Sequence, residues 1–130
     1  MNPQRIHPEG WAPAKGYANG VAARGAQVFV CGLDADQGIA LAGEINGASY
    51  AGDLTVPEHA ETCVAHCLER YGRIDALFNV AGASGRRHGD GPLHLITDEG
   101  WDWTLDANLK SMFLVSRSVL RRMMARRGTR

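Results

Sequence analysis

The chain has 130 residues, a formal net charge of zero at pH 7 and a 45% share of hydrophobic residues. Zero net charge gives no reason to expect nucleic acid as the main partner. The absence of an apolar run of about eighteen residues gives no reason to expect a membrane span. The length fits one domain, which can bury roughly two thirds of its unfolded surface.

The cysteine content and the first residues of the chain indicate the cellular compartment. The three cysteines, Cys31, Cys63 and Cys67, are few and odd in number, which favours reduced thiols over a disulfide framework. Residues 1–7 contain no apolar core of a secretory signal. We therefore expect a cytoplasmic protein.

The N-terminal part has weak signals. Residues 1–13 contain three prolines, each of which removes a backbone donor, so we expect irregular chain there. Residues 14–24 predict a helix that Gly25 ends. Its two internal glycines each cost about 1 kcal/mol relative to alanine, so this helix is weak.

The next segments alternate between strand and helix patterns. Residues 26–31 are rich in β-branched and aromatic side chains, which predicts a strand. Asp34 then provides an N-cap, with Gln37 three residues later, for a helix that stops at Gly47. A second short strand is expected at 48–51.

The pattern then repeats. Residues 55–58 (Thr-Val-Pro-Glu) form a capping-box signature with proline in the first turn, which predicts a helix that runs to Tyr71. Gly72 stops it. Residues 76–80 are apolar almost without a break, which is typical of a strand buried on both faces.

A polar loop at 83–92 precedes the strongest helix pattern, at 97–127. The order strand-helix, three times over, predicts an α/β domain: a partial doubly wound parallel sheet with helices on both faces. Residues 1–130 then form a single incomplete domain. We expect the carboxyl ends of its three strands to line one rim, where ligands gather in open parallel sheets.

Four short motifs occur in a characteristic order: Gly25-Ala26-Gln27-Val28, Gly52-Asp53-Leu54, Asn79-Val80-Ala81-Gly82, and Asn108-Leu109-Lys110-Ser111-Met112-Phe113-Leu114. With them, residues 25–127 resemble the short-chain dehydrogenase/reductase family, the NAD(P)-dependent oxidoreductases with a Rossmann-like sheet. The resemblance implies hydride transfer between NAD or NADP and an alcohol or carbonyl substrate.

The resemblance also implies a cofactor site at the strand ends. Asp53 and Leu54 would contact the adenine, and Asn79, Ala81 and Gly82 would lie beneath the cofactor. The small residues leave room for a flat ring system to approach the backbone. For Asn79 the alternative is a turn that only caps the strand end.

The choice between NAD and NADP stays open. Gly32 stands where NAD-preferring members of the family carry an acid for the adenosine ribose. Asp34, two residues on, is a candidate for that contact, with a role only as helix cap as the alternative.

The glycine-rich turn of the family is missing. The family's spacing puts its three glycines on His7, Trp11 and Pro13, and Gly10 is out of register. Such glycines allow a tight turn and close approach to the pyrophosphate. We therefore expect cofactor binding to be weak or absent.

Asn108 would be the asparagine of the family's Asn-Ser-Tyr-Lys catalytic set, which supports the lysine through water. The chain resembles a fragment truncated before the other members of that set. Its lysines are Lys15 and Lys110, and neither follows a tyrosine by four residues. Because proton transfer needs a group at hydrogen-bond distance, we expect the chain to be inactive alone.

Two other functions remain open. The first is a non-catalytic nucleotide-binding or dimerisation module, since in the family the helix at 98–127 commonly packs against its copy. The second is a gene remnant without a function.

A metal site is the last alternative. His59, Cys63, His66 and Cys67 share one sector of a helical wheel, but structural zinc sites usually gather ligands from separate segments. We expect no metal there.

Overall fold

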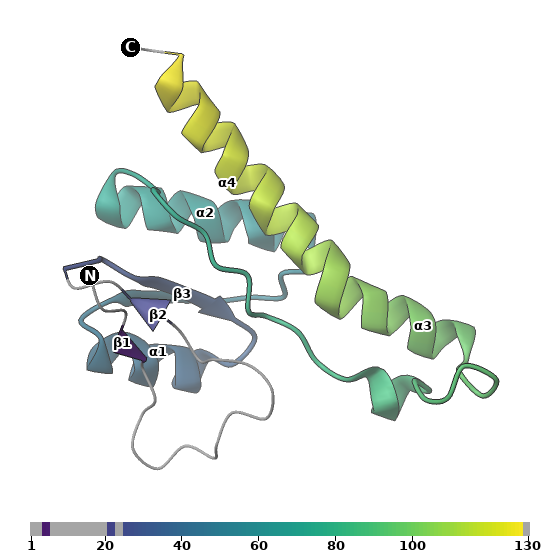
Figure 1. The fold of residues 1–130 in the computed structure, drawn as a ribbon. Helices are drawn as coiled ribbons and strands as arrows, with labels where there is room; N and C mark the ends of the chain where they lie inside the picture. The colour runs from purple at the N-terminus through teal and green to yellow at the C-terminus, as the bar shows by residue number, and fades with distance from the viewer. Residues whose placement is uncertain (1–3, 6–20, 23–24, 129–130) are drawn as a thin grey trace.

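The computed structural model describes residues 4–5, 21–22 and 25–128 (Figure 1). Within these ranges, no helix combines the length and the apolar character needed to cross a membrane. A parallel sheet of two strands, β3 (Phe29–Gly32) and β4 (Ala48–Ala51), pairs Phe29 with Ala48 and Gly32 with Ala51. Two of the three expected parallel strands are thus confirmed.

A second, antiparallel pair joins β1 (Gln4–Arg5) to β2 (Val21–Ala22). The expected helix is therefore wrong at Val21–Ala22, where β-branched valine suits an extended backbone. The expected irregular chain is likewise wrong at Gln4–Arg5. The other residues of both segments lie outside the described residues.

Helix α1 (Ala35–Glu44) begins where the sequence predicts it. Asp34 Oδ1 accepts a hydrogen bond from the Gln37 backbone N–H at 3.0 Å, and Asp34 Oδ2 accepts one from Gln37 Nε2 at 2.8 Å. This side-chain cap satisfies a backbone donor that the first turn of a helix leaves free. Asn46 has a φ of 50° and turns the chain towards β4.

Helix α2 (Pro57–Tyr71) ends as expected at Gly72, which has a φ of 73° and donates its N–H to Leu68 O. The expected capping box at its start is wrong, because the N-cap is Val56. Thr55 instead donates both its hydroxyl and its N–H to Asp53 Oδ1, at 2.7 and 2.9 Å.

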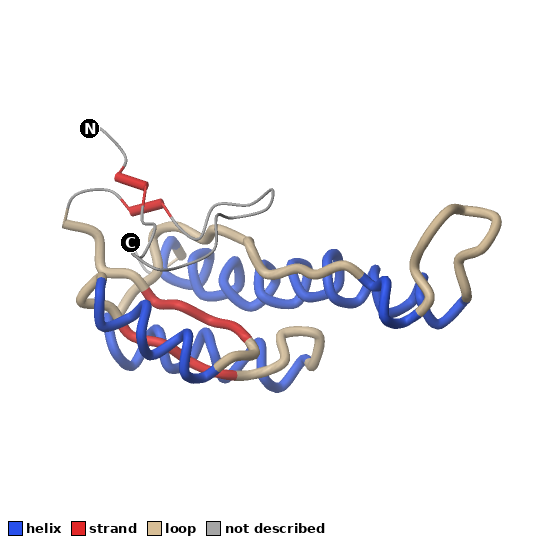
Figure 2. Tube along the Cα trace, turned by 90° about the horizontal axis from the view of Figure 1, so that it is seen from below, coloured by secondary structure: helices blue, strands red, loops and turns tan. Residues whose placement is uncertain are grey.

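The expected strand at 76–80 is also wrong: this stretch has no strand assignment (Figure 2), and Leu77 and Phe78 are 38% and 63% exposed. A strand exists by hydrogen bonding to a neighbour, and no described residue pairs with this stretch. The expected rim of three strands is therefore reduced to two strand ends and one extended segment.

The last helical region covers the expected range in three pieces. α3 (Asp98–Leu105) is capped by Thr97, whose Oγ1 accepts from the Gly100 N–H at 3.0 Å. A π-helical turn, η2 (Asp106–Lys110), joins it to α4 (Ser111–Arg127). A short 3-10 turn, η1 (Gly85–His88), lies in the polar loop before them.

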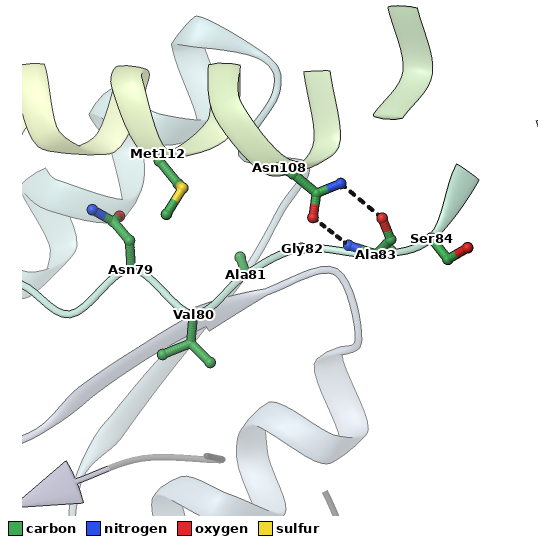
Figure 3. A pocket seen from close by; sticks show the side chains of 8 residues that line it. All are labelled: Asn79, Val80, Ala81, Gly82, Ala83, Ser84, Asn108 and Met112. Carbon is green, nitrogen blue, oxygen red and sulfur yellow. Dashed lines mark hydrogen bonds between the residues drawn. The ribbon is translucent and has the colours of Figure 1, made fainter. Parts of the chain in front are cut away.

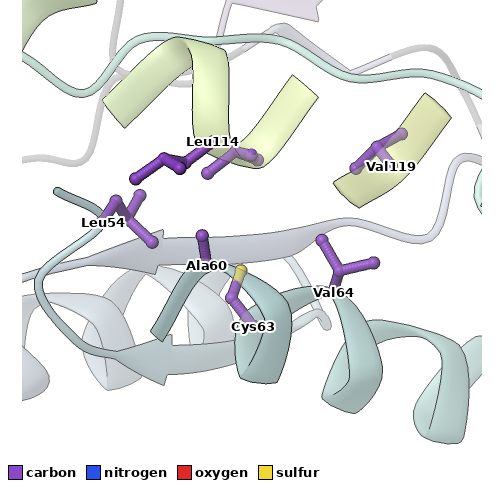
Figure 4. Close-up of a cluster of buried hydrophobic side chains, with 7 residues drawn as sticks. Leu54, Ala60, Cys63, Val64, Leu114 and Val119 are labelled. Atoms are coloured by element: carbon purple, nitrogen blue, oxygen red, sulfur yellow. The ribbon is translucent and has the colours of Figure 1, made fainter. Parts of the chain in front are cut away.

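The core lies between the sheet, α2 and α4 (Figure 4), while α1 covers the opposite face of the sheet (Figure 1). Its buried members are Leu54, Ala60, Cys63, Val64, Leu114, Val115 and Val119. Helices on both faces of a parallel sheet confirm the predicted fold class.

Cys31 of β3 and Cys63 of α2 form a disulfide, with Cα atoms 6.7 Å apart. The expectation of reduced thiols is therefore wrong for this pair, and only Cys67 is free among the described residues. Cysteine counting missed the bond because the two residues are 32 positions apart and become neighbours only when α2 packs on the sheet.

Candidate functional site

A pocket of about 340 Å³ lies where the extended segment after α2 meets η2 and α4 (Figure 3). The segment contributes Asn79, Val80, Ala81, Gly82, Ala83 and Ser84, and the helices contribute Asn108 and Met112. Its volume lies at the lower end of the range for small-molecule sites, about 300–1,000 Å³. Four residues expected at the site thus line one pocket: Asn79, Ala81, Gly82 and Asn108.

Hydrogen bonds of the Asn108 side chain link the segment 79–84 to the helical region. Asn108 Nδ2 donates to Ala83 O at 2.7 Å and Asn108 Oδ1 accepts from the Ala83 N–H at 3.1 Å (Figure 3). Asn108 Nδ2 also donates to Thr104 O at 2.8 Å. Both amide donors are therefore in use, and one Oδ1 lone pair is left. Asn108 lies in the π-helical turn, a feature frequent at functional sites.

Gly82 is close to Asn108. A methyl group at position 82 would collide with Asn108 Oδ1, so only glycine fits without a shift. We expect Gly82→Ala to push the Asn108 amide off Ala83 and to lower the free energy of unfolding by about 1–2 kcal/mol, measured by urea denaturation.

Gly91 provides the control for this change, because nothing lies within 4 Å of a methyl group built there. Gly91→Ala should leave the stability within about 0.5 kcal/mol of the original. Equal effects of the two substitutions would contradict the close packing of Gly82 against Asn108.

Asn79 makes a second link to the helix, since its Nδ2 donates to Ser116 Oγ at 3.0 Å. Sequence reasoning missed Ser116. Ser116 lies eight residues after Asn108, about two helical turns, so both residues lie on one face of the helix. This spacing could have identified Ser116 from the sequence.

The other expected site residues lie away from this pocket. Leu54 is 8% exposed and packs in the core. Both carboxylate oxygens of Asp34 accept hydrogen bonds from Gln37. Asp53 follows β4, and its N–H donates to His59 Nδ1 at 3.1 Å, a contact that the sequence did not indicate.

The environment of Asp53 favours its charged form. The hydroxyl of Thr55 has the largest effect in lowering the carboxyl pKa below 3.8, followed by the Thr55 N–H; the charges of His59 and Lys110 add to this, while burial opposes it. Because the folded-state pKa is depressed, Asp53 contributes stability that is present above its ordinary pKa and lost as the pH falls through the lower folded value.

We expect Thr55→Val to raise the pKa of Asp53 towards its ordinary value, since the largest cause of the shift is removed. An NMR titration of the Asp53 carboxyl carbon measures this. Thr62→Val is the control, because the Thr62 hydroxyl donates to Glu58 O instead. An Asp53 pKa that is the same in Thr55→Val as in the original chain would contradict the assignment.

Within the part of the chain that the structure describes, no group of three or more His, Cys, Asp or Glu residues could hold a metal ion. Cys63 is held in the disulfide, and His59 is bonded to the backbone of Asp53. The described site is therefore built from amides, hydroxyls and backbone groups.

Comparison with known proteins gives consistent results. Residues 12–130 match the family model described as enoyl-(acyl carrier protein) reductase. A short-chain dehydrogenase/reductase from Penicillium canescens is 36% identical over 129 residues, which cover 96% of this chain and 48% of the relative. A 3-oxoacyl-acyl-carrier-protein reductase from Escherichia coli is 30% identical over 115 residues, which cover 87% of this chain and 46% of the relative.

Solved structures show the same similarity. A variant of actinorhodin polyketide ketoreductase with NADPH superposes with a TM-score of 0.71 at 29% identity, over 79% of this chain and 41% of the other. A metagenomic short-chain oxidoreductase in complex with NADP gives a TM-score of 0.67 at 31% identity, over 78% and 47%. The chain therefore spans less than half the length of these relatives.

Proposed function

Because the chain belongs to the short-chain dehydrogenase/reductase family, we propose that it forms the nicotinamide-dinucleotide-binding part of an oxidoreductase. The reaction is hydride transfer between NAD or NADP and an alcohol or carbonyl substrate. Two similar structures are described with NADPH and NADP. They favour the same class of cofactor here.

The observation that carries this proposal is the pocket between the segment 79–84 and Asn108. Ala81, Gly82 and Ala83 present backbone with little side chain, so a flat ring system can approach closely. A methyl group at Gly82 would collide with Asn108 Oδ1, so glycine allows the segment to lie directly against Asn108. The pocket is lined by this segment and by the helical region of Asn108 and Met112, and not by the ends of β3 and β4.

In this proposal Asn79, Ala81 and Gly82 hold the cofactor, whose nicotinamide ring supplies or accepts the hydride when bound. Asn108 is a positioning residue: it holds Ala83 and thereby fixes the shape of the pocket. The chain keeps the backbone in place before any ligand arrives, which lowers the ordering cost of binding.

The adenine end of the cofactor is assigned to the segment after β4. Asp53 is held in place there by Thr55 and His59, and the backbone of Leu54 follows it, while the Leu54 side chain packs in the core. Asp34 already accepts two hydrogen bonds from Gln37 and keeps further lone pairs with which its carboxylate could accept a bond from a ribose hydroxyl.

Binding should be weak and turnover negligible for these 130 residues alone. The glycine-rich turn is absent, which removes close backbone contacts to the pyrophosphate. No tyrosine is followed four residues later by lysine, so the general acid of the reaction is not supplied.

Isothermal titration with NADPH and NADH tests the proposal. We expect saturable binding with a Kd on the order of 0.1–1 mM, and loss of that binding in Ala81→Leu, which fills the pocket. Ala125→Leu, at an exposed position near the end of α4, is the control. Absence of saturable binding to either cofactor would contradict the proposed site, and turnover in a hydride-transfer assay would contradict the proposed inactivity.

A second candidate function is self-association through α3, η2 and α4. Trp101, Leu105, Leu109 and Phe113 follow one another at four-residue spacing and are 38–61% exposed, so they form an apolar stripe of the kind that marks interaction surfaces. Light scattering tests this function: we expect a dimer that Leu109→Glu converts to a monomer. A monomeric original chain would contradict it.

A further inference from the structure

The Cys31–Cys63 disulfide ties the sheet to α2 close to the two strand ends. Cys31 precedes Gly32, the last residue of β3, and Gly32 O accepts from the Gly52 N–H at 2.8 Å. Cys63 lies one helical turn after His59, which bonds Asp53. One bond thus joins β3 to the helix that holds the segment after β4.

The fold does not depend on this bond for its packing. Cys63 is 4% exposed within the core cluster, and Cys31 packs against that cluster from the sheet. A reduced cysteine behaves as a small apolar side chain, so both oxidation states suit the same core. Reduction removes the covalent cross-link between two residues that are 32 positions apart in the sequence, and with it the restriction that the cross-link places on the unfolded chain.

The third cysteine does not compete for the bond. Cys67 lies one turn beyond Cys63 on α2 and is half-buried, and burial raises the pKa of its thiol. Because the thiolate is the attacking species in exchange, a thiol held protonated reacts slowly. Attack of Cys67 on the disulfide is therefore slower than attack by an exposed thiol.

We propose that Cys31 and Cys63 form a reversible redox site that controls the strand ends: the disulfide fixes β3 covalently to α2 in the arrangement that binds nucleotide, and after reduction packing alone holds the two elements together. The control of nucleotide binding rests on the function proposed above. The redox couple itself does not.

The reductant is a small thiol such as glutathione. Its thiolate attacks Sγ of Cys31, the more exposed of the pair, forming a mixed disulfide and releasing the Cys63 thiolate, which takes up a proton. A second glutathione thiolate attacks the glutathione sulfur of the mixed disulfide. The Cys31 thiolate leaves and is protonated, so two electrons and two protons reduce the protein and one oxidised glutathione forms.

Thiol titration in denaturant tests the couple. We expect one reactive thiol per chain before reduction, that of Cys67, and three after reduction. Equilibration in glutathione buffers should convert one form into the other in both directions. The reduced chain should melt about 10 °C lower than the oxidised chain. Three thiols before reduction, or equal melting temperatures, would overturn the proposal.

Matched variants separate the two parts of the proposal. The double variant Cys31→Ser with Cys63→Ser should show the reduced behaviour in any buffer, while Cys67→Ser should keep the redox response. The oxidised chain should bind NADPH about tenfold more tightly than the reduced chain, a typical coupling between sites. Equal affinities would overturn control of the strand ends. Absence of NADPH binding in both states would contradict the proposed function. The thiol counts and melting temperatures would still show whether Cys31 and Cys63 form a reversible disulfide.

Discussion

Truncation of Leu114 to alanine should lower the free energy of unfolding by about 2–5 kcal/mol. Leu114 is 5% exposed and belongs to the cluster by which α4 packs on α2 and the sheet. Among the described residues the parallel sheet has two strands, so this helix supplies much of the apolar cover on its face. Removing the side chain leaves a cavity that the few remaining neighbours fill poorly.

Leu120 on the same helix is the control, since it is 53% exposed. Leu120→Ala should change the stability by less than about 1 kcal/mol. Urea denaturation of both variants measures the difference. Similar losses in the two would contradict the packing of α4 by the face that carries Leu114.

Replacement of Asn108 by alanine should cost about 3 kcal/mol, because three hydrogen bonds of about 1 kcal/mol each are lost. The segment that carries Ala83 would then separate from η2, and the pocket would lose its shape. We expect NADPH binding to weaken by at least about tenfold, which corresponds to about 1.4 kcal/mol.

Lys110 lies in the same π-helical turn and is the control. Its ammonium group pairs with Asp106 at 2.9 Å on the surface, and such a pair contributes about 0.5 kcal/mol or less. Lys110→Ala should therefore keep the stability to within about 0.5 kcal/mol. If Asn108→Ala behaves like Lys110→Ala, Asn108 does not fasten the segment.

Local rules predicted the helix ends that depend on neighbouring residues alone. Asp34 caps α1 through Gln37, and Gly72 ends α2 in the left-handed conformation. The capping signal at Thr55 was wrong because the helix begins one residue later, with Val56 as its N-cap, and the Thr55 hydroxyl donates to the carboxylate of Asp53. The sequence pattern did not show at which residue the helix begins.

Structural features that depend on residues distant in the sequence were not predicted. Residues 76–80 have the composition of a buried strand, but hydrogen-bonded neighbours make a strand, and no described residue pairs with them. The bond between Cys31 and Cys63 likewise depends on how α2 lies on the sheet.

The candidate site was predicted in part for the same reason. Asn79, Ala81, Gly82 and Asn108 came from short motifs and line one pocket. The contact of Asn79 with Ser116 and that of Asp53 with His59 depend on packing and were not foreseen. Short motifs identify candidate site residues, whereas the tertiary structure determines which of those residues contact one another.

The proposed nucleotide site is tested most directly by an NMR titration of the ¹⁵N-labelled oxidised chain with NADPH, followed through the backbone amide signals. We expect the largest shifts on residues 79–84 and on Asn108 and Met112, which line the pocket. Shifts confined to the arginine-rich end of α4, at Arg121, Arg122 and Arg126, or no saturable shifts at all, would contradict the proposed site.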